Sequence, residues 1–387
     1  FNVGTGLADT MDWAEEYCKG EISDGGYVNK APYLRVMVPK SEQVTDCSPE
    51  SPDCDEVFQL QPEEAIVLIG VTPPPVNYFG YHALLWEKVY PDPGGSRPRI
   101  FATLGDTVNN ATVNTIGPTP FNSPVALIFT PDQTTEARVR AALRRAGYPA
   151  EIINTLVFPA SMLNLGFGET ADELRICMRI GKWEHPDAGI SYMENVSETL
   201  NVFRVTPGTP GIANPFPVPP LRVRGTGQTE MDLMNKLDQL RQGIIDNNPA
   251  MEATDIQSKP NWYEGYDYIQ RGINPGGDSR DAIFLSAGWL PEYESNEWTT
   301  LTDDEFLMVY GPNHVATGKA TYMSVNVYES ETAKLSIGQV FDDDLAATAL
   351  AYLPSGDPTA DLFYAYKISR NCGDEPNCLQ LSADDYN

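Results

Sequence analysis

Three apolar stretches decide the fold of this chain: Glu64-Ala-Ile-Val-Leu-Ile-Gly-Val71, Val76-Asn-Tyr-Phe-Gly-Tyr-His-Ala-Leu-Leu-Trp86 and Arg99-Ile-Phe-Ala-Thr-Leu-Gly-Asp106. The unbroken apolar run of the first stretch is typical of a strand that is buried on both faces. The other two stretches are rich in aromatic and β-branched residues, so we expect them to pair beside the first in a central sheet. Pro73-Pro-Pro75 interrupts the backbone between the first and second strands.

A β-α-β unit follows this region. We expect a buried strand over residues 124–129 and a helix that ends near Arg145, with Thr134 or Thr135 as its N-cap. Gly147 suits the end of that helix. The chain then returns as a strand over residues 151–158.

The longest helix is expected from Thr229 to about Asn247. It carries a core-facing stripe at helical spacing, formed by Met231, Leu233, Met234, Leu237, Leu240 and Ile244. Shorter helices are predicted at 10–18, 261–269 and 342–352, and further strands at 33–38, 174–180, 200–205, 282–287, 305–310, 320–328 and 362–368. Strands outnumber helices and only one crossover is clear. The sequence therefore predicts an α+β fold of mixed or antiparallel sheets with a few packed helices, stapled by disulfides.

Proline marks the expected division of the chain. Residues 207–220 contain six prolines and two glycines, a composition that favours an extended, stiff backbone. We interpret this segment as a linker between lobes or a strap over one of them. It would separate an N-terminal α+β lobe, residues 1–206, from a C-terminal α+β lobe, residues 221–387.

Charge excludes two classes of partner. Asp and Glu number 54 against 26 Lys and Arg, which gives a net charge of −28. Such a surface repels phosphate backbones and anionic lipid heads, so we expect neither nucleic-acid binding nor a membrane-surface role. No apolar run is long enough to insert into a bilayer. The acidic surface serves solubility, or it attracts a cationic partner or Ca²⁺.

Six cysteines indicate an oxidising compartment. We expect two disulfides that close short polar loops and one that joins distant parts of the chain: Cys47–Cys54, Cys372–Cys378 and Cys18–Cys177. Six cysteines allow fifteen connectivities, and this one is the most economical. A zinc site is disfavoured because the chain contains no Cys-x-x-Cys.

Two further features favour secretion. The sequence starts at Phe1 and not at Met, as a processed mature chain would, although a chain prepared for expression can begin in the same way. Asn110-Ala-Thr112 and Asn195-Val-Ser197 are glycosylation sequons in polar surroundings. Together with the cysteines, they predict a secreted or lumenal glycoprotein.

His314 is the first candidate catalytic residue. It lies in a short connection between two expected strands, after the turn formers Gly311-Pro-Asn313. Loops held between strands are a common place for catalytic and binding residues. Tyr310, Lys319 and Tyr322 flank His314, and we expect them to line a substrate site. The alternative is a structural connection whose polar side chains bind backbone groups.

His82 is the second candidate. Strand alternation places it on the same face as Tyr78, Gly80, Leu84 and Trp86. As an acid/base residue it would need a carboxylate, and Asp106 at the end of the neighbouring strand is the expected partner, orienting His82 or His314. The alternatives are a core histidine with satisfied ring nitrogens and an Asp106 that caps its own turn. His185, in an expected exposed turn, is assigned no chemistry.

No sequence motif identifies a cofactor. The chain lacks a Gly-x-Ser-x-Gly elbow, a Walker loop, a dinucleotide fingerprint and a His-Glu-x-x-His zinc motif. The acidic clusters Asp303-Asp304 and Asp342-Asp-Asp344 could ligate Ca²⁺, but neither has EF-hand spacing. Turn polarity and helix N-terminal charge explain them equally well, so the metal content is left open.

Three classes of function remain. The first is a secreted hydrolase or lyase that uses histidine acid/base chemistry on a neutral small or oligomeric substrate. The second is an extracellular structural or assembly subunit of a filament, coat or complex, without catalysis. The third is a carbohydrate- or ligand-binding module. The sequence does not decide whether the protein is an enzyme.

Overall fold

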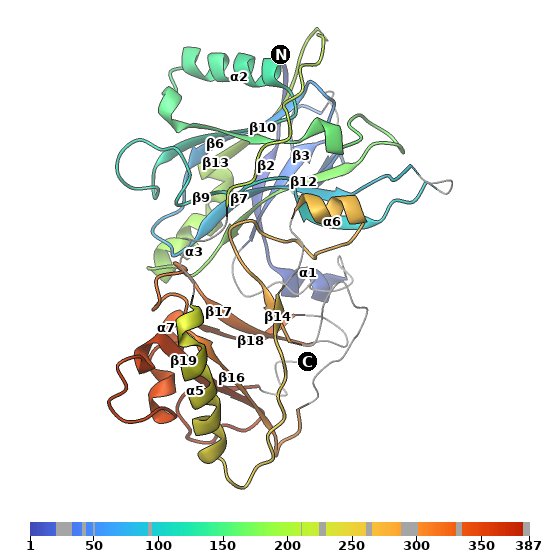
Figure 1. Cartoon of the computed structure of the whole chain (residues 1–387). Helices are drawn as coiled ribbons and strands as arrows, with labels where there is room; N and C mark the ends of the chain where they lie inside the picture. The colour runs from blue at the N-terminus through green and yellow to red at the C-terminus, as the bar shows by residue number, and fades with distance from the viewer. Residues whose placement is uncertain are drawn as a thin grey trace.

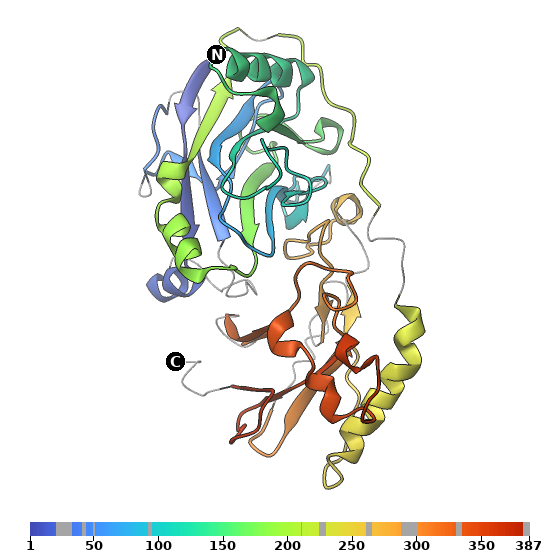
Figure 2. The ribbon, with the colours of Figure 1, turned by 90° about the vertical axis from the view of Figure 1, so that its left-hand side faces the viewer.

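The chain forms two lobes, an upper one of two large sheets and a lower one of small sheets with a long helix, as seen in Figures 1 and 2. The structure is a computed structural model. It describes residues 1–20, 33–40, 44–48, 51–91, 95–209, 211–223, 230–260, 265–287, 301–329 and 335–381. The expected α+β class is confirmed, with sheets, several helices and disulfides.

The first sheet of the upper lobe contains the central β-α-β unit. Its strand order is β1 (Asn2–Thr5), β13 (Leu200–Thr206), β6 (Ala65–Val71), β10 (Pro124–Thr130) and β11 (Ile153–Val157). All pairs are antiparallel except β10 with β11. Helix α2 (Gln133–Arg145) connects these two parallel strands and lies along one face of the sheet (Figure 1). Its N-cap is Asp132, which accepts from Thr135 N, so the predicted unit is confirmed with the cap two or three residues earlier.

The second sheet runs in the order β2 (Leu7–Met11), β3 (Tyr33–Pro39), β12 (Glu173–Ile180), β7 (Phe79–Glu87) and β8 (Arg99–Thr103). Three two-residue strands extend it: β4 (Cys54–Asp55) pairs with β3, β5 (Val57–Phe58) with β12, and β9 (Val108–Asn109) with β7. The expectation that β6 lies beside β7 and β8 is wrong. The proline break after β6 carries the chain from the first sheet to the second.

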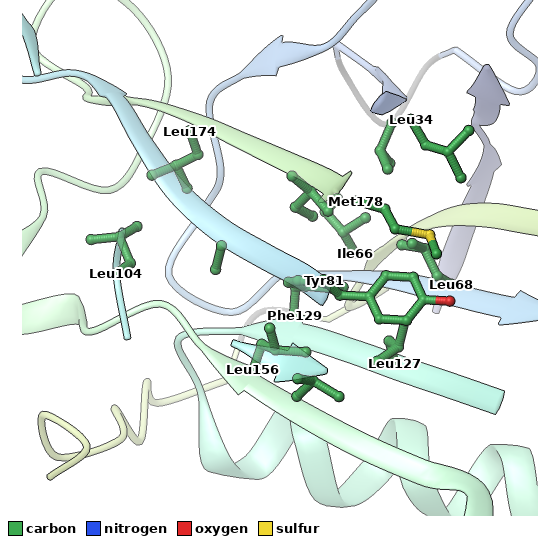
Figure 3. Packing of buried hydrophobic residues seen from close by; sticks show 14 of the residues in the cluster. Leu34, Ile66, Leu68, Tyr81, Leu104, Leu127, Phe129, Leu156, Leu174 and Met178 are labelled. Atoms are coloured by element: carbon green, nitrogen blue, oxygen red, sulfur yellow. The ribbon is translucent and has the colours of Figure 1, made fainter. Parts of the chain in front are cut away.

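The core of the upper lobe fills the space between the two sheets (Figure 3). Leu68 of β6 and Phe129 of β10 meet Tyr81 of β7 and Met178 of β12 there. On its other face β6 contributes to a second cluster beneath α2, which contains Ala65, Val67, Ile128, Val139 and Leu143. The prediction that residues 65–71 are buried on both faces is therefore confirmed for most of the strand.

The lower lobe is built on helix α5 (Met234–Asp246), which a 3-10 turn, Met231–Leu233, precedes. It packs against β16 (Phe306–Pro312) of a three-stranded sheet completed by β19 (Phe363–Ser369) and β20 (Cys378–Gln380). A separate hairpin pairs β17 (Ser324–Tyr328) with β18 (Ser336–Phe341), and α7 (Asp342–Leu345) follows it. Two further 3-10 turns occupy Thr348–Ala351 and Ala360–Leu362.

Part of the predicted helical stripe on α5 is exposed. Leu233, Leu240 and Ile244 are buried, as expected. Met231 and Met234 face solvent instead, because only one side of this helix contacts the small sheet. The expected start of the helix at Thr229 lies outside the described residues.

The remaining elements are short: α1 (Trp13–Lys19), α3 (Pro186–Glu194), α4 (Val196–Thr199), α6 (Tyr266–Arg271), β14 (Lys259–Pro260), β15 (Leu285–Ser286), and 3-10 turns at Ala150–Ile152 and Ala160–Met162. The predicted helix start at Thr10 is wrong. Thr10 pairs with Leu34 in the second sheet, and Asp12 accepts from Glu15 N at the start of α1 instead.

The described residues of the Pro-rich segment, which we call the strap, lie along the upper lobe and run down one side of the molecule in Figure 2. Phe216 N donates to Pro131 O at 2.9 Å, and Asn214 N donates to Asp132. Farther along, Tyr266 Oη donates to Pro219 O at 3.4 Å. These bonds fasten the middle and the C-terminal end of the segment, and the division of the chain into two lobes at this segment remains a prediction.

Two of the three expected disulfides are formed, Cys47–Cys54 and Cys372–Cys378. The third is wrong: Cys18 is exposed in the last turn of α1, whereas Cys177 is buried in the middle of β12, and neither is bonded. Within the described residues, none of the helices is both long and apolar enough to cross a bilayer.

Candidate functional site

His82 lies on the polar face of the second sheet, where β7 brings it next to Tyr78 and Thr107. Its Nε2 is 3.2 Å from Tyr78 Oη, and its Nδ1 is 3.3 Å from Thr107 Oγ1. Tyr78 Oη donates its proton to Asp281. The tautomer that satisfies all three groups carries the proton on Nε2 and accepts from Thr107 at Nδ1. His82 is thus a buried, neutral, fully bonded imidazole.

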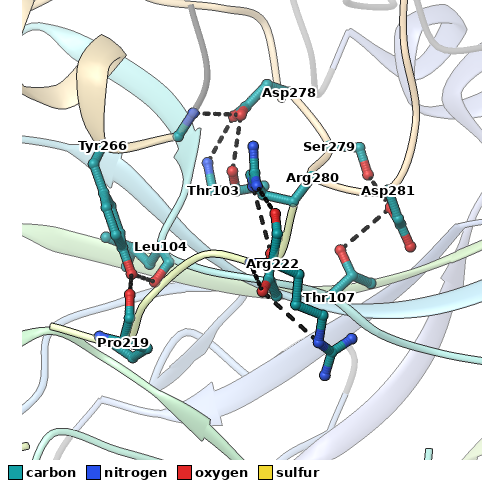
Figure 4. A network of polar contacts seen from close by, with 12 residues as sticks. Thr103, Leu104, Thr107, Pro219, Arg222, Tyr266, Asp278, Ser279, Arg280 and Asp281 are labelled. Atoms are coloured by element: carbon teal, nitrogen blue, oxygen red, sulfur yellow. Dashed lines mark hydrogen bonds and ion pairs between the residues drawn. The ribbon is translucent and has the colours of Figure 1, made fainter. Parts of the chain in front are cut away.

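Asp281 is the carboxylate at this site, and Figure 4 shows part of its polar network. It accepts from Asn109 Nδ2 at 2.7 Å and from Ser279 Oγ at 2.7 Å, in addition to Tyr78 Oη at 3.1 Å. These donors come from β9, from the segment before β7 and from the chain after α6. Asp281 therefore ties the 265–287 segment to the edge of the second sheet.

Burial and charge together set the protonation of this cluster. Burial, with the nearby Arg179 guanidinium, lowers the pKa of His82 to about 3, and Asp281 opposes the shift only in part. Desolvation raises the pKa of Asp281. The interaction with His82 and the hydrogen bonds from the surrounding donors lower this pKa by a larger amount, so its net shift is downward. Burial and the Asp281 charge raise the pKa of Tyr78. At neutral pH the only ionised member of this trio is Asp281.

Asp106 does not orient His82 as expected. Its carboxylate accepts from Arg222 N at 2.7 Å and lies 3.4 Å from Arg280 Nε. It therefore fixes the end of the strap and the segment after α6, both of which bring an arginine to it. The carboxylate next to His82 is Asp281, which follows far along the chain and has no sequence signal that links it to His82.

His314 has a carboxylate partner that sequence reasoning missed. Its Nδ1 lies 2.9 Å from Glu230 Oε2, across 84 residues of sequence. Thr317 Oγ1 donates to the same carboxylate. Glu230 immediately precedes the 3-10 turn Met231–Leu233 that begins the long helix, a place where an acidic residue is expected from helix N-terminal charge alone. No local spacing could have indicated the pair.

The His314–Glu230 pair is accessible. The His314 side chain is 37% exposed and that of Glu230 is 20% exposed. Among the described residues, Nε2 of His314 has no hydrogen-bond partner. Burial raises the pKa of Glu230, but hydrogen bonds from Thr317 and His314, and the charge of Lys319, lower it more. Glu230 is therefore an ionised carboxylate that holds one imidazole nitrogen and leaves the other open.

The three expected substrate-binding residues have separate surroundings and do not line one site. Lys319 is close enough to Glu230 to lower the pKa of its carboxyl, and its backbone N donates to His314 O at 2.8 Å. Tyr310 packs in the core beneath α5, close to the Arg241–Asp255 ion pair. Tyr322 packs against Phe341, with 6.1 Å between ring centroids. Only Lys319 is shown beside the His314–Glu230 pair.

The two sequons occupy loops. Asn195 is exposed between α3 and α4, where its Nδ2 donates to Ser191 O. Asn110 is half-buried after β9, and its Nδ2 lies 3.4 Å from Asn77 O. Asn195 is the more accessible acceptor of the two, and glycosylation at both remains a prediction.

No metal centre is evident in the described part of the chain, where no three His, Cys, Asp or Glu residues are grouped to hold an ion. In the predicted calcium cluster at 342–344, Asp343 forms an ion pair with Lys182, and Asp344 accepts from Phe341 N. In the other cluster, Asp303 pairs with Arg370. These partners account for acidic side chains in both clusters.

Comparisons with known proteins do not identify the chain. No protein-family model matches it, and no curated protein matches it. A solved structure that matches is the crystal structure of the VPA0106 protein from Vibrio parahaemolyticus, with 13% sequence identity over 96% of this chain and 88% of that chain. Its TM-score of 0.38 is too low to support any inference about this protein.

Proposed function

We propose that this protein is a secreted enzyme, a hydrolase or lyase, in which His314 is the general acid/base and Glu230 orients it. The observation that supports this most is the 2.9 Å contact between His314 Nδ1 and Glu230 Oε2 on a partly exposed loop. An imidazole held at one nitrogen by a carboxylate presents the other nitrogen in a fixed direction. This arrangement suits proton transfer to or from a bound substrate.

The chemistry follows from the two side chains. Nε2 of His314 accepts a proton from water or from a substrate hydroxyl or C–H group, and it returns that proton to the leaving group. Glu230 stabilises the imidazolium that forms in between, because its carboxylate is ionised and lies against Nδ1. Lys319 adds a positive charge nearby, which would favour negative charge that develops on the substrate.

His82 has no catalytic role in this proposal. A base must be able to hold a proton near the working pH, and the pKa of His82 is lowered to about 3. Both of its ring nitrogens are also bonded within the protein. We assign His82 to the structural network that holds Asp281.

Secretion is supported by composition and covalent structure. The two disulfides close short loops, and such bonds persist in oxidising compartments. The net charge of −28 gives solubility and disfavours an anionic substrate, so a neutral substrate is proposed.

The test is an activity screen of the full chain against neutral chromogenic glycosides and esters, and against neutral polysaccharides for lyase products. His314→Ala should lower kcat/KM by about 10²- to 10⁴-fold. Glu230→Gln should give a smaller loss, because the carboxylate assists but does not transfer the proton to substrate. His185→Ala, a change at an exposed histidine, is the matched control and should leave the rate unchanged. Parent-level turnover by His314→Ala would overturn the proposal.

One observation favours the alternative of an assembly subunit. Ile283, Phe284 and Leu285 are consecutive apolar residues whose exposed fractions are 69%, 45% and 56%. Consecutive exposed apolar side chains are typical of association surfaces. Light scattering after size exclusion tests this function: a concentration-dependent oligomer that Phe284→Ser disrupts would support it, and a monodisperse monomer would contradict it.

A further inference from the structure

Helix α2 is positively charged in a strongly acidic protein. Its 13 residues contain four arginines and one acidic residue, Glu136, so its local charge is +3. The chain as a whole has a net charge of −28, with 54 acidic residues against 26 basic ones. The four arginines are Arg138, Arg140, Arg144 and Arg145. This helix is therefore an exception to the composition of the rest of the chain.

Three of these arginines lie on the side of α2 that faces solvent. Val139 and Leu143 bury the opposite side of the helix against the first sheet. Arg138, Arg144 and Arg145 are exposed, and we call these three residues the basic face of α2. Figures 1 and 2 show the helix at the outer end of the upper lobe, beside the N-terminus.

The basic face has no carboxylate partner within the part of the chain that the structure describes. None of its three arginines forms an ion pair there, whereas Arg140 on the same helix pairs with Glu136. Arg138 lies over the ring of Phe1, 4.6 Å from the ring centre, a contact that leaves the guanidinium without a counter-charge. Acidic residues outnumber basic ones by two to one, so a shortage of carboxylates does not explain this lack of partners.

The helix dipole explains only part of this pattern. Arg144 and Arg145 lie in the last turn of α2, where positive charge stabilises a helix. Arg138 is in the middle of the helix, where the dipole has no such effect. Arginine is enriched in protein interfaces, and its planar guanidinium bonds to a carboxylate through two N–H groups. The basic face therefore has the charge and the residue type of a surface that binds carboxylates.

A surface of matching charge lies in the lower lobe. Asp303, Asp304 and Glu305 are consecutive exposed residues directly before β16, and we call them the acidic turn. Asp303 lies 3.6 Å from Arg370, but its side chain is 85% exposed. Glu305 accepts from the backbone and the hydroxyl of Thr302, and neither it nor Asp304 has a cationic partner among the described residues. The acidic turn is thus only partly neutralised within its own molecule.

These two surfaces cannot meet within one molecule. Figure 1 shows α2 on the side of the upper lobe that is away from the lower lobe, and it shows β16 in the lower lobe. A contact between the basic face of one molecule and the acidic turn of another is heterologous, because two different patches of identical chains meet. The net charge does not prevent such a contact. Salt screens charges beyond about 8 Å at physiological ionic strength, so the charges at the contact decide the interaction.

We propose that the basic face of α2 binds the acidic turn of a second copy of this chain, in a head-to-tail contact held by arginine–carboxylate pairs. The size of the basic face favours this partner over other anions. A long anionic polymer or a membrane would extend past α2 onto the acidic surface of the chain, which would repel it, whereas the acidic turn is only three residues long. The contact is small, so the association is weak and depends on concentration. It requires no chemistry at His314.

Sedimentation velocity of the full chain tests the contact. The parent should form larger species as its concentration rises to about 1 mM in about 0.15 M NaCl, and it should lose them in about 1 M NaCl, where the charge pairs are screened. Arg144→Glu/Arg145→Glu should weaken the association by about tenfold or more. Lys19→Glu/Arg241→Glu is the matched control, because it changes the net charge by the same amount at exposed sites elsewhere. Phe284→Ser should associate as the parent does, which separates this contact from the exposed apolar residues around Phe284.

A mixture of two variants tests the head-to-tail arrangement. Asp303→Lys/Asp304→Lys reverses the charge of the acidic turn and leaves α2 unchanged. This variant and the α2 variant should each be monomeric alone. Their equimolar mixture should form a 1:1 dimer and nothing larger, because each molecule keeps one half of the contact.

Thermal unfolding shows whether each variant is folded. Arg144→Gln/Arg145→Gln adds no negative charge to the end of α2, so it replaces the glutamate variant if that one unfolds. A parent that stays monomeric at every concentration would overturn the proposal. A mixture of folded variants that forms no dimer, or association that the matched control weakens equally, would overturn it as well.

Discussion

Arg204 and Glu64 form an ion pair inside the upper lobe, where each side chain is only 1% exposed. Arg204 Nε lies 3.1 Å from Glu64 Oε1, and the guanidinium also donates to Pro39 O and Gln59 O. Thr206 Oγ1 donates to the same carboxylate at 2.6 Å. The pair joins β13 to the turn before β6 and to the end of β3, so it links the two sheets.

Glu64→Gln should strongly destabilise the protein, because it leaves the Arg204 charge buried without its counter-charge. Breaking one partner of a buried ion pair costs about 3–5 kcal/mol. Urea unfolding at pH 7 measures the change. Asp255→Asn, which breaks the exposed pair with Arg241, is the control and should leave the unfolding midpoint unchanged. Equal midpoints for Glu64→Gln and the parent would contradict this role.

The buried His82 should make stability depend on pH. In the unfolded chain the imidazole titrates near pH 6.5, whereas in the folded protein the pKa is lowered to about 3. Between these values the unfolded state binds the additional proton. Stability from this group is therefore fully present above pH 6.5, and it falls by about 1.4 kcal/mol for each pH unit as the pH drops toward 3.

The measurement is the free energy of unfolding between pH 7 and pH 4.5, compared with His82→Gln. Glutamine keeps hydrogen-bonding capacity but does not titrate, so its curve should be flatter than that of the parent over this window. The usual Asp and Glu carboxyls titrate mostly below it. Parallel curves for parent and variant would show that His82 takes up its proton over the same pH range in the folded protein as in the unfolded chain, contrary to its environment in the structure.

Periodicity predicted the local parts of the fold. The apolar run of β6 correctly indicated burial on both faces, and the β10–α2–β11 unit followed from its strand and helix patterns. The partners of β6 were not predictable in this way. Pairing of β6 with β13 and β10 is fixed by residues far away in sequence. The sequence of an apolar strand does not indicate to which sheet the strand belongs.

The candidate site shows the same limit more clearly. His314 was found because histidine is rare here and its loop is polar, and both of these are local signals. Its carboxylate partner Glu230 lies 84 residues away, and Asp281 lies 203 residues from Tyr78, to which it is bonded. Such pairs arise from tertiary packing alone. The expected partner Asp106 was chosen by proximity in sequence, and the arginines that actually bind it, Arg222 and Arg280, come from later segments.

Gly243 is needed in α5 for close packing and not for backbone conformation. A Cβ at this position would lie 1.8 Å from Tyr352 O, a contact that backbone movement alone could relieve. Gly243→Ala should therefore destabilise the lower lobe by about 1–3 kcal/mol, even though alanine favours helices by about 1 kcal/mol. Thermal unfolding measures this loss of stability. Gln239→Ala, on the exposed side of α5, is the control. A stabilised Gly243→Ala variant would mean that the helix does not approach Tyr352 this closely.

The free thiols offer the sharpest check on the covalent structure. Cys18 is exposed, whereas burial raises the pKa of the Cys177 thiol and leaves less of the reactive thiolate. Iodoacetamide should therefore label Cys18 alone in the native protein at pH 8. In denaturant without reductant it should label Cys18 and Cys177, and only reduction should release the other four cysteines. Peptide mass spectrometry reads out each position. If the denatured, unreduced protein takes up no label, Cys18 and Cys177 are bonded to each other after all. The second sheet would then have to open at β12 to bring the two sulfurs together.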